Sequence, residues 1–256
     1  MLGNQILPIN ITPHMTVYEL VEAFGNPRAY NAGRLYEACK LYEKMLDEDA
    51  TIALTLAGAM TPAGIGGPII KLMENGSIDF IISTGANLYH DLHFALELPI
   101  YQGDFRADDV KLRKEGIVRI YDIFVPEDVL LKTDKFLKEI FLKERLDKPI
   151  STAELHNIIG EATLKKTKHP ERSILAQAVK YDVPIYTSSP SDSSIGMNLS
   201  AAKMSGGTIV VDPDLDVMET TAIVYSSEMN GAIEIGGGSP KNFYLQTQPQ
   251  LSQILD

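Results

Sequence analysis

Apolar and polar residues alternate with a helical period over the first fifty residues of the chain. Two segments, 16–24 and 29–48, carry apolar side chains three or four positions apart, as at Ala38, Leu41 and Met45, with charged residues between them. Because an α-helix turns once every 3.6 residues, this spacing gives each segment one apolar stripe. We therefore predict two amphipathic helices in a helical extension that covers residues 1–50.

The pattern changes after residue 50, where short runs are apolar at every position. Such runs, followed by glycine or proline, are typical of strands buried on both faces of a sheet. Segments with helical spacing separate most of them, which predicts an α/β fold with a doubly wound, mostly parallel sheet and helices on both faces. The predicted strands are 51–57, 78–83, 183–187, 208–212 and 231–236. The predicted helices are 64–75, 88–98, 171–181, 192–204 and 215–228, the last capped by Asp212 or Asp214, with a further helix, 127–145, in an irregular insertion at 103–150.

Composition narrows the class of protein. With 256 residues, 45% of them hydrophobic, the chain can bury a sizeable core as one large domain or two small ones. No apolar run approaches the ~18 residues of a membrane-spanning helix, and the N-terminus lacks a signal-peptide pattern. Cys39 is the only cysteine, which excludes an internal disulfide and fits a reducing cytoplasm. The net charge of −11 argues against nucleic acid as a partner, because such binding depends on neutralising phosphates.

Three consecutive glycines, Gly236, Gly237 and Gly238, follow the last predicted strand. Glycine at a strand end lets a ligand touch the main chain, and Pro240 can begin a helix whose N-terminus faces an anion such as a pyrophosphate. A tight turn without a ligand explains the same glycines. The run is not a Gly-x-Gly-x-x-Gly fingerprint, because Lys241 stands where the third glycine belongs.

A longer pattern identifies a family. The stretch YQGDFRADDVKLRKEGIVRIYDIFVP, residues 101–126, combines a Tyr-x-Gly-x-Phe motif with Leu-Arg-x-x-Gly-Ile-x-Arg-Ile and Val-Pro. The flanking segments ISTGANLYHDL (82–92), VPIYTSSPSDSSIG (183–196) and the glycine-rich region 210–242 follow in the matching order. From about residue 30 to its end the chain resembles the deoxyhypusine synthase family, and we expect one such domain over residues 1–256.

The resemblance implies a Rossmann-like subunit that binds NAD and forms a homotetramer with active sites between subunits. In that family NAD takes a hydride from spermidine, and the resulting imine passes its aminobutyl group to an enzyme lysine and then to a lysine of a translation factor. The implied cofactor residues are Thr84, Gly85, Asp192 and the glycine run Gly236–Gly238. Asp192 makes physical sense there, because a carboxylate at a strand end can accept both ribose hydroxyls. Its alternative role is the N-cap of the helix 192–204.

Four substrate positions depart from the family pattern. Tyr89 and His90 replace two adjacent glutamates, Met197 replaces an aspartate, and Asn242 replaces a histidine. Carboxylates hold ammonium groups by charge-assisted hydrogen bonds, so the changes leave a polyamine or related amine as the expected substrate but put spermidine itself in question. Tyr89 can still offer a π face to a cation. His90 and His93 share one helix face, but without a third ligand we expect no metal site.

The C-terminal part of the family pattern is the second departure. The family's acceptor lysine lies in a Glu-Ala-Val-Ser-Trp-Gly-Lys type motif after the glycine run, whereas this chain has no tryptophan and ends at Asp256. We therefore expect that part of the domain is missing or that the protein has lost this step, and that Lys241 is not the nucleophile, which leaves the catalytic residue unknown. Three alternatives to protein-lysine transfer stay open: a homospermidine synthase-like transfer to a free diamine, a non-catalytic NAD-binding or regulatory subunit, and a plain NAD dehydrogenase.

Overall fold

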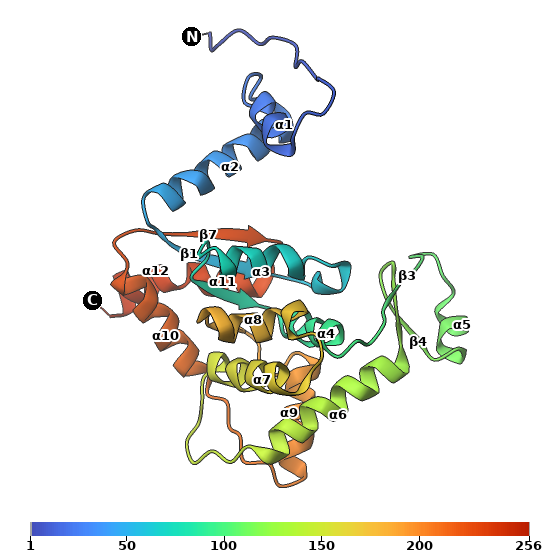
Figure 1. Cartoon of the computed structure of the whole chain (residues 1–256). Coiled ribbons are helices and arrows are strands. Elements are labelled where there is room, and N and C mark those ends of the chain that lie inside the picture. The colour runs from blue at the N-terminus through green and yellow to red at the C-terminus, as the bar shows by residue number, and fades with distance from the viewer. Residues whose placement is uncertain (1, 256) are drawn as a thin grey trace. The chain divides into compact units, whose positions relative to one another are not determined.

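The computed structural model describes residues 2–255, which divide into two compact units after Ala50 (Figure 1). The first unit contains α1 (Val17–Phe24) and α2 (Tyr30–Asp47), which pack against each other. Thr16 begins α1 with a capping box, because Glu19 N donates to Thr16 Oγ1 over 3.2 Å and Thr16 N donates to the Glu19 carboxylate over 2.7 Å. Both helices predicted for this region are confirmed to within a residue at each end.

The second unit is built on a four-stranded parallel sheet with the strand order β6-β2-β1-β7. The strands are β1 (Thr51–Leu56), β2 (Phe80–Ser83), β6 (Ile185–Tyr186) and β7 (Asn230–Ile235). The chain adds β2 and then β6 on one side of β1 and returns to add β7 on the other side. The strand order thus reverses between β1 and β7, which is the place where open α/β sheets bind their ligands, beyond the carboxyl ends of the strands.

Helices cover both faces of this sheet, as the doubly wound prediction requires (Figure 1). Between the strands lie α3 (Gly66–Glu74), α4 (Gly85–Ala95), α8 (Ile174–Tyr181), α9 (Ser194–Met204) and α10 (Pro213–Ser226). The helix α11 (Gly238–Leu245) follows β7, and α12 (Thr247–Pro249) and a π-helical turn, Gln250–Ile254, come after it. Short 3-10 segments, η1 (Thr61–Ala63) and η2 (Pro170–Arg172), precede α3 and α8.

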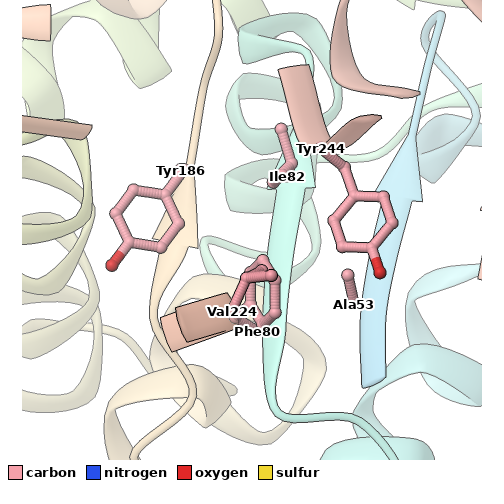
Figure 2. Packing of buried hydrophobic residues seen from close by; sticks show 6 residues of the cluster. All are labelled: Ala53, Phe80, Ile82, Tyr186, Val224 and Tyr244. Carbon is pink, nitrogen blue, oxygen red and sulfur yellow. The ribbon is translucent and has the colours of Figure 1, made fainter. Parts of the chain in front are cut away.

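Side chains from three strands and two helices form the core on one face of the sheet (Figure 2). Phe80 of β2 lies with its ring centroid 6.2 Å from that of Tyr244 on α11, and Val224 of α10 packs into the same cluster. Ile52 and Leu54 of β1 alternate toward the opposite face and are also buried, at 1% and 0% exposure. Burial on both faces explains why the sequences of β1 and β2 are mostly apolar.

The predicted strand 208–212 is wrong. Only Val211 pairs there, in an isolated parallel bridge with Ile150, whose N–H donates to Val210 O and whose carbonyl accepts from Asp212 N, both over 2.9 Å. The ladder cannot extend, because the chain enters the helix α7 (Thr152–Lys166) two residues after Ile150. The prediction omitted α7 altogether. Asp212 N-caps α10 instead of ending a strand, which confirms one of the two predicted caps.

The insertion 103–150 is more regular than predicted. A second, antiparallel sheet with the order β3-β5-β4 forms from β3 (Tyr101–Gln102), β4 (Ile117–Ile120) and β5 (Ile123–Pro126). The short helix α5 (Asp109–Lys114) precedes β4, and α6 (Glu127–Lys143) confirms the predicted helix 127–145. Arg119 of β4 holds Asp109 of α5 with two hydrogen bonds of 2.7 and 2.9 Å, which fixes the helix to the hairpin.

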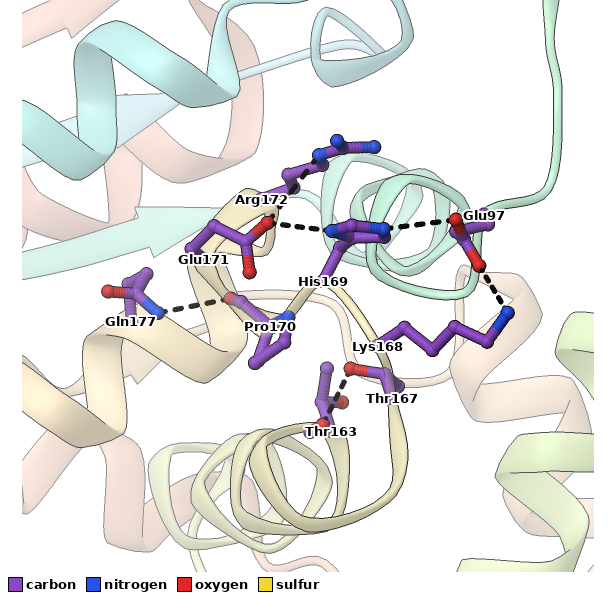
Figure 3. A network of polar contacts seen from close by, with 9 residues as sticks. All are labelled: Glu97, Thr163, Thr167, Lys168, His169, Pro170, Glu171, Arg172 and Gln177. Carbon is purple, nitrogen blue, oxygen red and sulfur yellow. Dashed lines mark hydrogen bonds and ion pairs between the residues drawn. The ribbon is translucent and has the colours of Figure 1, made fainter.

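A polar network ties the end of α4 to η2 (Figure 3). Glu97 contacts Lys168 Nζ and His169 Nε2, each over 3.0 Å, and His169 Nδ1 lies 2.9 Å from a Glu171 carboxylate oxygen. These groups are largely exposed, so the pairs orient the loop without contributing much stability. In the part of the chain that the structure describes, no helix is long and apolar enough to cross a membrane.

Candidate active site at the carboxyl ends of the strands

The loops after β1 and β2 are joined by Thr84. Its N–H donates to Leu56 O over 3.0 Å, which extends the pairing of β2 with β1, and its hydroxyl donates to Gly58 O over 2.5 Å. Because the hydroxyl is used in this way, Thr84 precedes α4 without capping it through its side chain. The first N–H groups of α4 therefore have no side-chain acceptor and point toward the edge of the sheet.

Asn87, which the sequence analysis did not single out, fixes the same loop. Its side-chain oxygen accepts from Met60 N over 2.6 Å and Thr61 N over 3.1 Å, and its amide nitrogen donates to Ala57 O and Thr84 Oγ1. Asn87 has 0% exposure, so its own side chain is shielded from water. A polar amide residue three positions after Thr84, at the place where the predicted helix begins, was the available sequence signal.

The loop after β6 approaches α4 closely. Gly85 has no side chain, and a Cβ atom there would lie 2.4 Å from Ser193 Oγ. Ser193 caps α9, because its hydroxyl accepts from Gly196 N over 3.1 Å. The alternative role for Asp192 as the cap is therefore wrong. Asp192 is exposed at this edge, and its carboxylate has no hydrogen-bond partner among residues 2–255.

The glycine run after β7 completes the edge. Gly236 has a φ of 80° and Gly238 one of 63°, a region of the Ramachandran map that favours glycine. A Cβ atom on Gly236 would also lie 2.9 Å from Ala57 Cβ, whereas one on Gly237 would meet nothing within 4 Å. The hydroxyl of Ser239 contacts that of Ser188, which joins the loops after β7 and β6. Gly237 thus presents bare main chain to an open space.

Two of the four predicted substrate residues lie side by side on α4. Tyr89 is 2% exposed, and its hydroxyl lies 2.8 Å from Asp134 Oδ1 and 3.1 Å from Leu130 O, both on α6. Burial raises the pKa of Tyr89, and the Asp134 carboxylate adds to the effect. The ring of His90 stands edge-on to that of Tyr89 with centroids 5.3 Å apart. Burial lowers the pKa of His90 to about 4, so the ring is neutral at pH 7.

Residues 19–256 match the deoxyhypusine synthase family, which is more than nine-tenths of the chain. The chain is 47% identical to a deoxyhypusine synthase-like protein of Nostoc punctiforme over 263 aligned positions, covering 99% of this chain and 67% of that protein. It is 39% identical to a protein of Methanosarcina acetivorans named "Probable deoxyhypusine synthase 1", covering 93% of this chain and 73% of that one.

The chain belongs to the deoxyhypusine synthase family.

The fold agrees with that of a solved structure described as a candidate deoxyhypusine synthase from Entamoeba histolytica. The two superpose with a TM-score of 0.65 at 19% identity, covering 88% of this chain and 77% of the other. The Nostoc comparison shows that this family member spans about two thirds of the length of its relative. Both the recognition of the family and the α/β fold class are confirmed.

The other two predicted substrate residues, Met197 and Asn242, lie on other helices. Met197 is on α9 and is 63% exposed, and its neighbour Asn198 donates to Asp134 Oδ1 over 2.7 Å. Asp134 therefore links α9 to Tyr89 on α4. Asn242 is exposed on α11, which packs on β1 and β2. Contacts thus connect Tyr89, His90 and the start of α9, while Asn242 belongs to the glycine-run side of the edge.

Two buried carboxylates hold helices in place near this site. Asp91 of α4 accepts from Ser173 Oγ and from Ile174 N and Leu175 N, over 2.6, 2.8 and 3.2 Å, so it caps the start of α8. Asp216 of α10 accepts from Thr152 N and Thr152 Oγ1 over 2.7 and 2.8 Å. Burial raises the pKa of each to about 6 against the opposing effect of these hydrogen bonds.

A cavity of about 460 Å³ beside β6 is lined by His156, Glu154 and Glu219, and by none of the predicted cofactor residues. Within residues 2–255 no three histidine, cysteine or acidic side chains gather as metal ligands do.

Proposed function

We propose that the protein is an NAD-dependent transferase that moves an aminobutyl-type group from a polyamine to an amine acceptor, a protein lysine. The observation that carries the proposal is the meeting of four loops, those after β1, β2, β6 and β7, at the edge of the sheet where the strand order reverses. Thr84 joins Gly58, Gly85 touches Ser193, and Ser188 touches Ser239. These contacts gather Thr84, Gly85, Asp192 and the glycine run at one edge.

The residues present suit a dinucleotide. Neither α4 nor α11 has a side-chain cap, so the free N–H groups of two helix N-termini are available to a pyrophosphate. The bare main chain at Gly237 allows a close approach, and the exposed carboxylate of Asp192 can accept ribose hydroxyls. When bound, NAD supplies the acceptor for the hydride removed beside the amine nitrogen.

The amine would lie along α4 and α9, within reach of His90 and Met197, with Asn242 on the other side and Tyr89 behind. Few charges are available to it, because Tyr89 is bound to Asp134 and His90 is neutral. We therefore expect that the geometry of hydrogen bonds and the shape of the site hold the amine more than ion pairs do. A homotetramer in the cytoplasm is part of the same proposal, since family members place active sites between subunits.

Calorimetric titration of NAD into the 256-residue chain and an Asp192→Asn variant tests the cofactor assignment. A hydrogen bond to a charged group contributes about 1.5–3 kcal/mol, so the variant should bind about 10- to 150-fold more weakly. Ser193→Ala is the matched control, because it removes the α9 cap next door and should lower stability more than affinity. Equal NAD affinity in the folded Asp192→Asn variant, or no binding by the parent chain, would contradict the proposal.

A further inference from the structure

A chain of polar side chains runs from His90 into the interior between α4 and α6. His90 Nδ1 lies 2.9 Å from His93 Nε2, and His93 Nδ1 lies 2.9 Å from Thr133 Oγ1. Thr133 Oγ1 lies 2.9 Å from the carbonyl oxygen of Val129, one turn earlier on α6. His93 and Thr133 are both at 0% exposure, so water cannot replace the inner contacts.

The number of N–H groups on the two histidine rings fixes which atom donates in each of these hydrogen bonds. Burial lowers the pKa of His90 to about 4 and that of His93 to about 3, so at pH 7 each ring carries a single N–H. If the Thr133 hydroxyl donates to Val129 O, His93 Nδ1–H donates to Thr133 and His90 Nδ1–H donates to His93, and all three contacts are hydrogen bonds. If the hydroxyl donates to His93 instead, the contact with Val129 is lost. The first arrangement is favoured because it makes three hydrogen bonds where the second makes two.

The outer ring nitrogen of His90, at the end of this series of polar side chains, faces open space. His90 Nε2 has no hydrogen-bond partner among residues 2–255. The buried side-chain atoms that lack a partner in this part of the chain are Thr187 Oγ1 and Thr221 Oγ1, so His90 Nε2 is not a buried atom. His90 lies five residues after Gly85, which is about 7.5 Å along α4 from the sheet edge. In the favoured arrangement Nε2 carries no hydrogen, so it presents a lone pair at that distance from the candidate site.

We propose that His93 and Thr133 are positioning residues that hold His90 in the Nδ1–H tautomer, so that His90 Nε2 is a fixed acceptor for an N–H group of the amine substrate. The identity of the ligand rests on the proposed function, whereas the tautomer depends only on α4 and α6. A ring that stays neutral to such low pH is a poor base for an alkylammonium group. The role of His90 is therefore to orient the amine by a hydrogen bond and not to remove its proton.

The tautomer can be measured without any ligand. Two-bond ¹H–¹⁵N correlation spectra of the ¹⁵N-histidine-labelled chain at pH 7 distinguish the two neutral tautomers, and His90→Gln assigns the His90 signals among the five histidines. We expect Nδ1–H for both His90 and His93, with a through-hydrogen-bond ¹⁵N–¹⁵N coupling between the rings. An Nε2–H tautomer of His90 would overturn the proposal.

Two substitutions of Thr133 separate positioning from packing. Thr133→Val keeps the shape but removes the hydroxyl, so His93 loses its inner acceptor and His90 should become a mixture of tautomers. Thr133→Ser keeps the hydroxyl and should restore the pure Nδ1–H form. A folded Thr133→Val variant with His90 still purely Nδ1–H would contradict the positioning role, and the parent spectrum remains decisive if that variant does not fold.

Putrescine and spermidine, each added with NAD, test the contact with substrate. We expect the ¹⁵N resonance of His90 Nε2 to move on amine binding while that of His156 stays in place. An unmoved His90 signal in a chain that binds both NAD and amine by calorimetry would overturn the substrate contact. Absence of NAD binding, together with the expected tautomers, would instead contradict the proposed function and leave the positioning role standing.

Discussion

Gly85 begins α4 directly against Ser193, with so little space between them that a Cβ atom on the glycine would lie 2.4 Å from both Cβ and Oγ of the serine. The contact joins the loop after β2 to the loop after β6. Ser193 is not free to move away, because its hydroxyl caps α9 by accepting from Gly196 N. A hydrogen atom in place of Cβ at residue 85 therefore lets two strand ends meet at the candidate site.

Replacing Gly85 by alanine should damage both stability and the site. Overpacking a tight contact costs about 1–3 kcal/mol, and the shift of Ser193 should also move Asp192 and weaken NAD binding. Gly67→Ala on α3 is the matched control, because a Cβ atom there meets nothing within 4 Å and alanine favours helix by up to about 1 kcal/mol. Urea unfolding and NAD calorimetry measure both effects. Equal behaviour of the two variants would show that the Gly85–Ser193 contact is not constraining.

Tyr89 is expected to act through packing rather than through its π face. Tyr89→Phe removes the hydroxyl that pairs with Asp134 and Leu130 O, and it should lower the free energy of unfolding by about 1 kcal/mol. Tyr225→Phe, at a side chain that is 77% exposed, should change nothing. If Tyr89→Phe instead leaves stability intact and weakens amine binding, Tyr89 is a substrate residue and the packing role is wrong.

Asp91 should make the protein less stable as the pH rises through the range 4 to 6. Its folded pKa of about 6 lies above the unfolded value of 3.8, so the folded state holds a proton that the unfolded state has released. The resulting stability is fully present below the unfolded pKa and is lost as the pH passes the folded pKa, by up to about 3 kcal/mol. Asp91→Asn should remove that part of the pH dependence in chemical unfolding at pH 4 and pH 7.

Asp192→Asn is the matched control for this experiment, because it removes one exposed charge from the same edge of the sheet. The control should keep the pH dependence of the parent chain. Burial also raises the pKa of Asp216. Replacing only one of the two aspartates should therefore remove only part of the pH dependence of stability. The prediction for Asp91 would be wrong if the free energy of unfolding of the parent chain rose between pH 4 and 6 and that of the Asp91→Asn variant rose equally.

The sequence predicts most of the central sheet because burial on two faces leaves a simple signal. The runs that contain Ile52 and Ile81 are mostly apolar and buried, whereas the run that contains Ile233 lies at an edge of the sheet and carries the exposed Glu234. Each of the three runs became a strand. The run at 208–212 has the same composition but no partner strand, since Ile150 is followed at once by α7. The antiparallel sheet was missed because its strands are only two to four residues long and are mostly partly exposed.

The candidate site was predictable where it depends on main chain and not where it depends on distant side chains. The glycine run and Thr84 follow strands, so their place at the sheet edge could be inferred from parallel topology. The shared helix face of His90 and His93 could also be read from their spacing. Thr133 lies 40 positions further along the chain from His93, and only the packing of α6 on α4 brings the two together. The same holds for Asp134 and Tyr89.

Lys241 should not carry covalent chemistry. An acceptor lysine needs enclosed surroundings that keep its amine uncharged, whereas Lys241 is half-buried in the first turn of α11, next to the glycine run where we place the cofactor phosphates. Borohydride reduces an imine between enzyme and substrate to a stable adduct. We therefore expect no substrate-derived mass on Lys241 when the 256-residue chain is incubated with NAD and either spermidine or putrescine, reduced, digested and mapped by mass spectrometry. Lys241→Arg keeps the positive charge and should bind NAD as the parent chain does, whereas Lys241→Ala should bind it more weakly. An adduct on Lys241 that disappears in Lys241→Arg would make the glycine-run segment itself the covalent site.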